Sequence, residues 1–283
     1  MDGRANLAGK SPAVSICIPA YKGAVVLAAT IESVLAQTFA DFELVVIDDN
    51  SPDETAAVVG RYTDSRIRFL RNTSNLGPQG NWNRCLAEAR GTYFKLLPQD
   101  DLLAPDCLAL QVGVLERDVE RQIALVFSAR EIIGPTGKVV FRRGYADAKE
   151  GRLAGLDIVS RCIRNGTNLI GEPGAVLLRK QLADATGPFD GQDAYVIDLD
   201  YWFRLLAVGD AYYFDQPLAS FRIYSGSWSV AIGAGQTGDF RRFIARIAAQ
   251  TRFSISRMDR WAGYLMAGVN THLRRLFYRF MLK

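Results

Sequence analysis

The chain has 283 residues, of which 49% are hydrophobic and 23% charged, a composition typical of a globular protein with a sizeable core. It has no run of 18 or more uncharged apolar residues, which argues against a membrane-spanning helix, and we expect no signal peptide at its N-terminus. The four cysteines lack C-x-x-C spacing, so we expect free thiols in a reducing cytoplasm at Cys17, Cys85, Cys107 and Cys162.

The charge of the chain is unevenly distributed. The whole chain carries +4, but residues 241–283 contain ten Lys/Arg and one acid, Asp259, which leaves the first 240 residues at −5. This asymmetry indicates a basic appendage on a mildly acidic domain, with an anionic surface as its partner. No nucleic-acid-binding module accompanies the charge, so we expect no nucleic acid partner.

Residues 14–128 alternate between short β-branched runs and amphipathic helical patterns. This alternation is typical of an α/β fold with a mostly parallel central sheet flanked by helices. The expected strands are 14–19, 42–48, 67–70, 93–97 and 123–128. The expected helices are 25–37, 53–62, 80–89 and 105–117, and Ser51 with Glu54 predicts a capping box before the second of them.

The pattern changes after residue 128. We expect a hairpin around 134–137, a helix over 154–166, a strand over 174–180, a helix over 197–209, and basic amphipathic helices from 239 onward. No long linker or repeat interrupts the chain. We therefore expect a single Rossmann-like domain over 1–230, with halves at about 12–128 and 129–230, followed by a flexible loop and a basic amphipathic helical extension over 231–283.

Paired acids follow two of the expected strands. Asp48 and Asp49 follow the second strand, and Asp100 and Asp101 follow the fourth. Ligands of parallel sheets bind at the carboxyl ends of the strands. Two carboxylates about 4 Å apart repel by about 4 kcal/mol at an effective dielectric of 20, so a convergent pair favours a bound cation such as Mg²⁺ or Mn²⁺. The alternative is that Asp49 caps the next helix and that the second pair is solvated.

Two stretches resemble glycosyltransferase family 2, the inverting nucleotide-sugar transferases with the A-type fold. They are "VSICIPAYKGAVVLAATIESVLAQTFADFELVVIDDNSPDET" and "NLGPQGNWNRCLAEARGTYFKLLPQDDLLAPD", and the resemblance extends more thinly to about residue 229. It implies a nucleotide-diphosphate sugar as donor. It also implies nucleotide contacts at Pro19, Ala20, Tyr21, Asp49, Asn75 and Gly77, with Asp48 in a structural role.

The same resemblance implies a divalent cation, Mn²⁺ or Mg²⁺. The metal-binding Asp-x-Asp of the family corresponds to Pro98-Gln99-Asp100-Asp101 here, so Pro98 replaces the first acid. By resemblance, Asp100 contacts the ribose or the metal and Asp101 binds the metal, with the order of the two roles left open.

The family's catalytic segment resembles "IDLDYWFRL", which places the general base at Asp198 and a supporting role at Asp200. A base is needed because a sugar hydroxyl attacks poorly unless its proton is accepted. From spacing alone, the two acids also fit ordinary first-turn helix residues favoured by the helix dipole.

Two further segments resemble acceptor-side or diphosphate-side elements of the family. "GEPGAVLLRK" places Gly171, Glu172 and Pro173 near the acceptor, and Arg222 is a candidate phosphate contact. Tyr224 stands where the family usually has a histidine that completes the metal or diphosphate site. The one histidine of the chain, His272, is expected to be an ordinary helix residue.

The segment "GAGQTG" at 233–238 matches the dinucleotide-binding pattern G-x-G-x-x-G. No strand candidate follows it to close a βαβ unit, so a mobile loop over the site is the better interpretation and a dehydrogenase the weaker one.

The predicted function is transfer of a sugar to a hydroxyl of a glycan or lipid-linked acceptor in cell-surface polysaccharide biosynthesis. The alternative is a non-catalytic nucleotide-sugar or glycan-binding module on the same fold. The location is cytoplasmic, either free or at the inner face of the cell membrane. The basic extension fits either a peripheral helix on an anionic membrane or a helix packed on its own domain.

Overall fold

The computed structural model describes residues 11–145 and 148–281. Its strands are β1 (Val14–Ala20), β2 (Phe42–Asp48), β3 (Ile67–Arg71), β4 (Tyr93–Leu96), β5 (Leu102–Leu103), β6 (Ile123–Ile133), β7 (Val139–Arg143), β8 (Gly151–Leu153), β9 (Val176–Arg179) and β10 (Asp210–Arg222). Its α-helices are α1 (Leu27–Leu35), α2 (Thr55–Val59), α3 (Gly77–Glu88), α4 (Cys107–Arg117), α5 (Gly155–Asn165), α6 (Lys180–Thr186), α7 (Ile197–Leu206), α8 (Trp228–Ile232), α9 (Gln236–Ala248) and α10 (Arg257–Met281). The short 3₁₀ helices are η1 (Pro173–Ala175), η2 (Ala194–Val196), η3 (Gly233–Gly235) and η4 (Thr251–Phe253).

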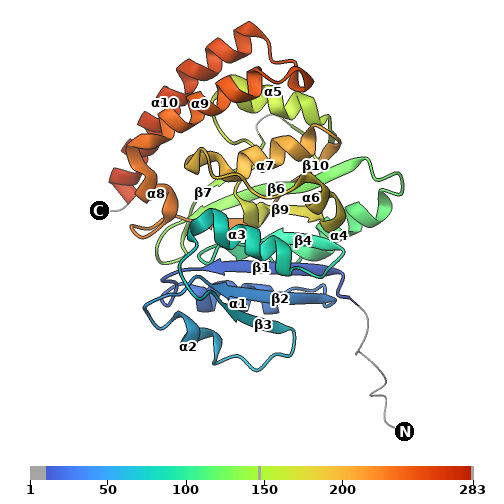
Figure 1. The fold of residues 1–283 in the computed structure, drawn as a ribbon, viewed down its shortest axis with the longest axis vertical. Coiled ribbons are helices and arrows are strands. Elements are labelled where there is room, and N and C mark those ends of the chain that lie inside the picture. Colours follow the sequence, from blue (N-terminus) through green and yellow to red (C-terminus); the bar gives the residue numbers. More distant parts are fainter. Residues whose placement is uncertain (1–10, 146–147, 282–283) are drawn as a thin grey trace.

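One sheet runs through the molecule in the order β3-β2-β1-β4-β9-β6-β10-β5, with β7 paired to β6 and β8 to β10 (Figure 1). The pairs β1/β2, β1/β4, β2/β3 and β6/β10 are parallel, which confirms the expected mostly parallel sheet. β9 lies antiparallel between β4 and β6 and joins the two halves. The parallel strands therefore end at one edge of the sheet, where the predicted site residues follow them.

Helices cover both faces of the sheet because the side chains of each strand alternate between two apolar layers. In β1, Ile16 and Ile18 face the cluster that contains Ile31 of α1 and Leu108 of α4. Cys17 faces the other cluster, which is built on α3, α5, α7 and α9. The domain therefore has three layers, with the sheet buried in the middle.

Two local expectations at the turns have different outcomes. The hairpin is confirmed, since β6 and β7 pair in antiparallel fashion around Gly134–Gly137. The capping box is wrong: the Ser51 hydroxyl accepts the Lys22 N–H at 2.9 Å, and α2 begins only at Thr55. The turn after β2 uses Ser51 to hold the loop after β1 instead.

The expected flexible loop after residue 230 is helical in the structure. Residues 233–238 form η3 and the first turn of α9, and helix α8 precedes them where a dinucleotide fold would need a strand. Phe240, Phe243, Ile244 and Ile247 of α9 belong to the main core. The start of the C-terminal extension is thus packed into the domain.

Helix α10 packs against α5 and α9, at the end of the molecule opposite β3 (Figure 1). A Cβ at Gly263 would lie 2.2 Å from the Ile163 carbonyl oxygen, so glycine is required for the close approach of α10 to α5. The outer face of α10 is apolar and exposed. We call the following residues, spaced three or four apart, the outer stripe: Met258, Trp261, Leu265, Val269, Leu273 and Leu276. Among the residues described, no helix has both the length and the apolarity needed to cross a bilayer.

Candidate active site

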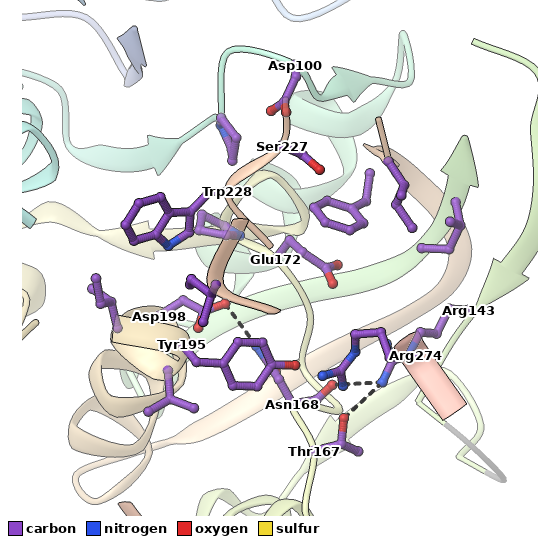
Figure 2. Close-up of a pocket in the computed structure, with 18 of the residues that line it drawn as sticks. Asp100, Arg143, Thr167, Asn168, Glu172, Tyr195, Asp198, Ser227, Trp228 and Arg274 are labelled. Carbon is purple, nitrogen blue, oxygen red and sulfur yellow. Dashed lines mark hydrogen bonds between the residues drawn. The ribbon is translucent and has the colours of Figure 1, made fainter. Parts of the chain in front are cut away.

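A cavity of about 230 Å³ lies where the loops after β4 and β10 meet the start of α7, and residues of α8 and α10 complete its lining (Figure 2). It gathers residues from segments distributed along the whole chain. Its polar and aromatic lining includes Trp82, Asp100, Arg143, Thr167, Asn168, Glu172, Tyr195, Asp198, Trp228, Arg274, Phe277 and Tyr278.

Asp198 lies in the first turn of α7 and lines this cavity. Its Oδ1 accepts the Leu199 N–H at 2.7 Å, and its Oδ2 accepts the Asn168 side-chain amide at 3.0 Å. Burial raises the pKa of Asp198 to about 7, and the nearby Glu172 charge acts in the same direction. A carboxylate with a pKa near the working pH can accept a proton and release it again, which is what a general base requires.

Asn168 holds the Asp198 carboxylate in place. Besides the bond to Asp198, its side-chain amide donates to the Gly171 carbonyl at 3.0 Å, and its amide oxygen accepts the Gly171 N–H at 2.9 Å. The indole N–H of Trp202 donates to the same Gly171 carbonyl at 3.3 Å. Gly171 has φ of 118°, which favours glycine. The 168–171 turn therefore fixes both Asn168 and the predicted base.

The two acids after β4 point in different directions. Asp100 lines the cavity, and burial raises its pKa to about 6. Asp101 is 1% exposed, and its Oδ1 accepts the Arg222 backbone N–H at 3.0 Å. Burial and the Asp100 charge raise the pKa of Asp101 well above its usual range. Asp101 was predicted as the metal ligand, but it joins the β4 loop to β10, and only Asp100 faces the cavity.

Apart from Asp100, the predicted nucleotide-binding residues lie outside the lining of the cavity, at the ends of β1 and β2 and at the start of α3. Gln99 ties the Pro19-Ala20-Tyr21 loop to the loop that carries Asp100. Its side-chain oxygen accepts the Tyr21 N–H at 2.8 Å, and its amide donates to the Tyr21 carbonyl at 2.9 Å. The Tyr21 side chain is 41% exposed and is open to a ligand.

Asp49 is 2% exposed, and its carboxylate is occupied by the start of α3. It accepts the Leu76 N–H at 2.8 Å, the Gly77 N–H at 2.9 Å and the Asn72 side-chain amide. Asn75 donates to the Asp49 carbonyl at 3.2 Å. Asp49 therefore orients the 75–77 turn. It caps a helix, as the alternative interpretation expected, but that helix is α3 and not α2.

Glu172 and Pro173, which were predicted as acceptor-side residues, line the cavity. Glu172 forms an ion pair with Arg130, whose side chain is 1% exposed. Burial alone would raise the pKa of Glu172, but the charges of Arg130 and Arg143 outweigh it and hold that pKa below its usual value. Glu172 is thus ionised and matched by a buried cation.

Two predicted site residues point elsewhere. Asp200 faces away from the cavity because it lies two residues after Asp198 on a helix; its carboxylate pairs with Arg204 at 2.9 Å and Arg246 at 2.7 Å. The Arg222 guanidinium donates to the backbone carbonyls of Asp100 at 2.9 Å and Pro135 at 3.1 Å. It therefore holds two loops together, and the prediction of a phosphate contact at Arg222 has no support in its geometry.

Metal-ligating groups are sparse: within residues 11–145 and 148–281, no cluster of three or more His, Cys, Asp or Glu residues could hold a metal ion. Asp100 is the one predicted metal ligand that faces the cavity. Tyr224, which stands in the place of the family histidine, lies close enough for the Asp100 charge to act on its hydroxyl; burial and that charge raise the pKa of Tyr224 to about 12.

Several cavity residues carry no local sequence signal. Arg143 of β7, Tyr195 of η2, Trp228 of α8 and Arg274 of α10 line the cavity, and none was predicted. Trp82 of α3 also lines it. The excess of basic residues after residue 241 was the only signal that pointed toward Arg274, and it indicated a surface.

A sequence model described as Glycosyl transferase family 2 matches residues 15–145. An uncharacterized protein of Mycobacterium tuberculosis is 33% identical over 201 residues, which cover 69% of this chain and 62% of that protein. The Escherichia coli protein named UDP-Glc:alpha-D-GlcNAc-diphosphoundecaprenol beta-1,3-glucosyltransferase WfgD is 36% identical over 120 residues, 42% of this chain and 46% of the relative. The matched parts thus span less than two thirds of the length of these curated relatives.

Among solved structures, S. aureus TarS 1-349 in complex with UDP-GlcNAc superposes with a TM-score of 0.67 at 18% identity, covering 92% of this chain and 72% of that one. Identity this low shows the fold alone. The sequence match identifies residues 15–145 as a glycosyltransferase family 2 domain, and the sheet topology and this superposition show that the chain has the A-type fold of that family.

Proposed function

We propose that the protein transfers a sugar from a nucleotide-diphosphate sugar to a hydroxyl of a glycan or lipid-linked acceptor, with inversion at the anomeric carbon. The observation that carries the proposal is that Asp198 and Asp100, which are 98 positions apart in the sequence, line one cavity at the carboxyl edge of the sheet. The reaction requires two acidic groups. Asp100 is suited to bind a cation on the diphosphate, and Asp198 is suited to accept the proton of the acceptor hydroxyl.

The donor would lie along the ends of β1, β2 and β4. The exposed Tyr21 ring and the 75–77 turn are available to the nucleotide, and Gln99 couples this rim to Asp100. The relative WfgD is named for a UDP-glucose donor, and the TarS structure holds UDP-GlcNAc. Both support a nucleotide sugar as the donor.

The residues fit a divalent cation of the Mg²⁺ or Mn²⁺ kind. Such ions bind through one or two carboxylates plus substrate phosphates, so Asp100, the one predicted metal ligand that faces the cavity, is a sufficient protein ligand. When bound, the cation neutralises charge on the leaving diphosphate.

The transfer needs one displacement. The acceptor oxygen attacks the anomeric carbon and forms the new glycosidic bond, while the bond from that carbon to the diphosphate oxygen breaks and the nucleoside diphosphate leaves. The hydroxyl proton goes to the Asp198 carboxylate, which Asn168 and the Leu199 N–H hold in position. Attack on the side opposite the leaving group inverts the anomeric centre.

The test replaces Asp198 with Asn, a change of one functional group at nearly constant volume. We expect transfer to fall by at least about 100-fold, the usual contribution of a general base, while binding of the nucleotide sugar persists. Asp157→Asn, at an exposed acid in the first turn of α5, is the matched control and should leave transfer unchanged. Unimpaired transfer in Asp198→Asn would reject the assignment.

A non-catalytic nucleotide-sugar or glycan-binding module remains the second candidate, favoured by Pro98 and Tyr224 at positions where the family has metal-binding residues. The wild-type protein separates the two, since an enzyme slowly hydrolyses the nucleotide sugar without acceptor in the presence of Mn²⁺ and a binding module does not.

The biological setting is proposed as polysaccharide biosynthesis at the cytoplasmic face of the membrane. The name of WfgD specifies an acceptor linked to diphosphoundecaprenol. In this chain, the outer stripe of α10 is flanked by the exposed arginines Arg257, Arg260 and Arg279. An apolar face bordered by arginines suits peripheral binding to an anionic bilayer.

A further inference from the structure

The cavity wall formed by β7 and α10 carries two guanidinium groups without an acidic partner. Arg143 donates to the Thr167 hydroxyl at 3.2 Å and to the Asn168 carbonyl at 3.4 Å. Arg274 donates to the Gln236 side-chain oxygen at 2.5 Å and lies over the Tyr195 ring at 5.0 Å. All of these partners are neutral, and neither arginine forms a salt bridge within the described part of the chain.

One ionised acid serves several cations in this wall. Glu172 pairs with the buried Arg130 and also acts on Arg143, so the positive charges of Arg130, Arg143 and Arg274 together exceed the negative charge of Glu172. Burial lowers the pKa of Arg143, and the neighbouring charges of Arg130 and Arg274 act in the same direction. Partly buried cations that repel one another are costly unless an anion joins them, so this wall is suited to a bound anion.

The position of the pair identifies which substrate would carry the anion. In Figure 2, Asp100 lies at one side of the cavity, and Arg143 and Arg274 lie at the other side beside Thr167 and Asn168. Asn168 also holds Asp198. The guanidinium pair is therefore on the side of the proposed base, away from the acid proposed for the donor diphosphate.

Aromatic groups surround the pair. The rings of Phe141 and Phe277 meet edge to face with centroids 5.4 Å apart, and both line the cavity. Phe141 is 42% exposed. An apolar rim next to two cations suits a ligand that has an anionic head and an apolar chain.

We infer that Arg143 and Arg274 bind a phosphate or diphosphate group of the acceptor, so that the acceptor is a phosphate-linked lipid. This inference rests on the proposed function and deepens it by naming the substrate class of the acceptor side. Arg274 makes α10 part of the active site in addition to its packing role.

The test measures binding of farnesyl diphosphate, a short prenyl diphosphate, by quenching of tryptophan fluorescence, since Trp82 and Trp228 line the cavity. Arg274→Gln should weaken this binding at least tenfold, and Arg274→Lys, which keeps the charge, should recover part of it. Arg275→Gln, at the exposed neighbouring position, is the matched control and should bind as wild type does. Farnesol, which lacks the diphosphate, should bind equally to wild type and Arg274→Gln.

A parallel titration with UDP and Mn²⁺ distinguishes the acceptor from the donor as the source of the anion. Loss of UDP affinity in Arg274→Gln with unchanged farnesyl diphosphate affinity would assign the pair to the donor and overturn the inference. Equal farnesyl diphosphate affinity in Arg274→Gln and Arg275→Gln would also overturn it. If wild type neither binds UDP nor hydrolyses a nucleotide sugar, the proposed function fails instead, so the two failures are distinguishable.

Discussion

At the scale of single residues, the site depends on a carboxylate held in surroundings that disfavour its charge. Asp198 receives two hydrogen bonds but forms no ion pair within the described residues, and burial raises its pKa to about 7. Asp200, two positions on, is matched by Arg204 and Arg246. One helical turn thus carries an acid tuned for proton transfer and an acid used for structure.

The raised pKa of Asp198 predicts the pH dependence of the reaction. The base must be ionised, so kcat/KM should rise with pH along a single acid limb with its midpoint near 7 and reach a plateau above it. Initial rates measured between pH 5 and pH 9 at low acceptor concentration check this. A profile already flat from pH 5 upward would contradict the assigned pKa.

The raised pKa of Asp198 also predicts how the stability of the folded protein changes with pH. Because the folded-state pKa lies above the ordinary carboxyl value, ionising Asp198 destabilises the fold progressively as pH rises toward and through about 7. Asp198→Asn removes that penalty, so its gain in melting temperature over wild type should be larger at pH 8 than at pH 5.

At the scale of elements, α9 holds the segment that presents Asp198. Arg246 of α9 bonds the carboxylates of Asp200 at 2.7 Å and Asp193 at 3.2 Å, which are 3% and 2% exposed. Asp239 of α9 accepts the Tyr195 N–H at 3.0 Å. The helix that the sequence suggested as part of a loose extension is therefore a support for η2 and the start of α7.

Arg246→Gln should destabilise the protein by about 2 kcal/mol, since each buried carboxylate loses one charged hydrogen-bond donor. Arg242→Gln, one turn earlier on α9, is the comparison variant. Arg242 also bonds Asp193, at 3.0 Å, but its side chain is 63% exposed, so its loss should cost less. Urea unfolding of both variants checks the order, and equal losses would contradict the role given to burial.

At the scale of the whole molecule, helix α10 carries both the outer stripe and part of the cavity lining. The C-terminal end of α10 lies near α8 (Figure 1), and both supply cavity residues, while the stripe runs along the outward face of the same helix. A protein resting on a bilayer through the stripe would have the guanidinium pair near the headgroups, where a lipid-linked phosphate is found.

Wild-type protein should therefore cosediment with phosphatidylcholine vesicles that contain phosphatidylglycerol, and less with vesicles that lack it, because the flanking arginines favour anionic lipid. Leu265→Glu combined with Leu273→Glu should reduce binding at least tenfold. Val119→Glu combined with Val208→Glu, at residues 86% and 68% exposed elsewhere, is the matched control and should bind as wild type does. Undiminished binding by the stripe variant would rule out the outer stripe as the membrane surface.

The sequence by itself determined the alternation of strands and helices, the edge of the sheet that carries the acids and the position of Asp198. Each of these follows from side-chain periodicity or from residues adjacent along the chain. The tertiary structure alone decided that Asp100 and not Asp101 faces the cavity, and that Asp200 and Arg222 are internal supports. It also decided that Arg143 and Arg274 line the cavity on the side of Asn168, the residue that holds Asp198. These facts depend on the direction in which a turn points each side chain and on packing between segments far apart along the chain, and neither leaves a local pattern in the sequence.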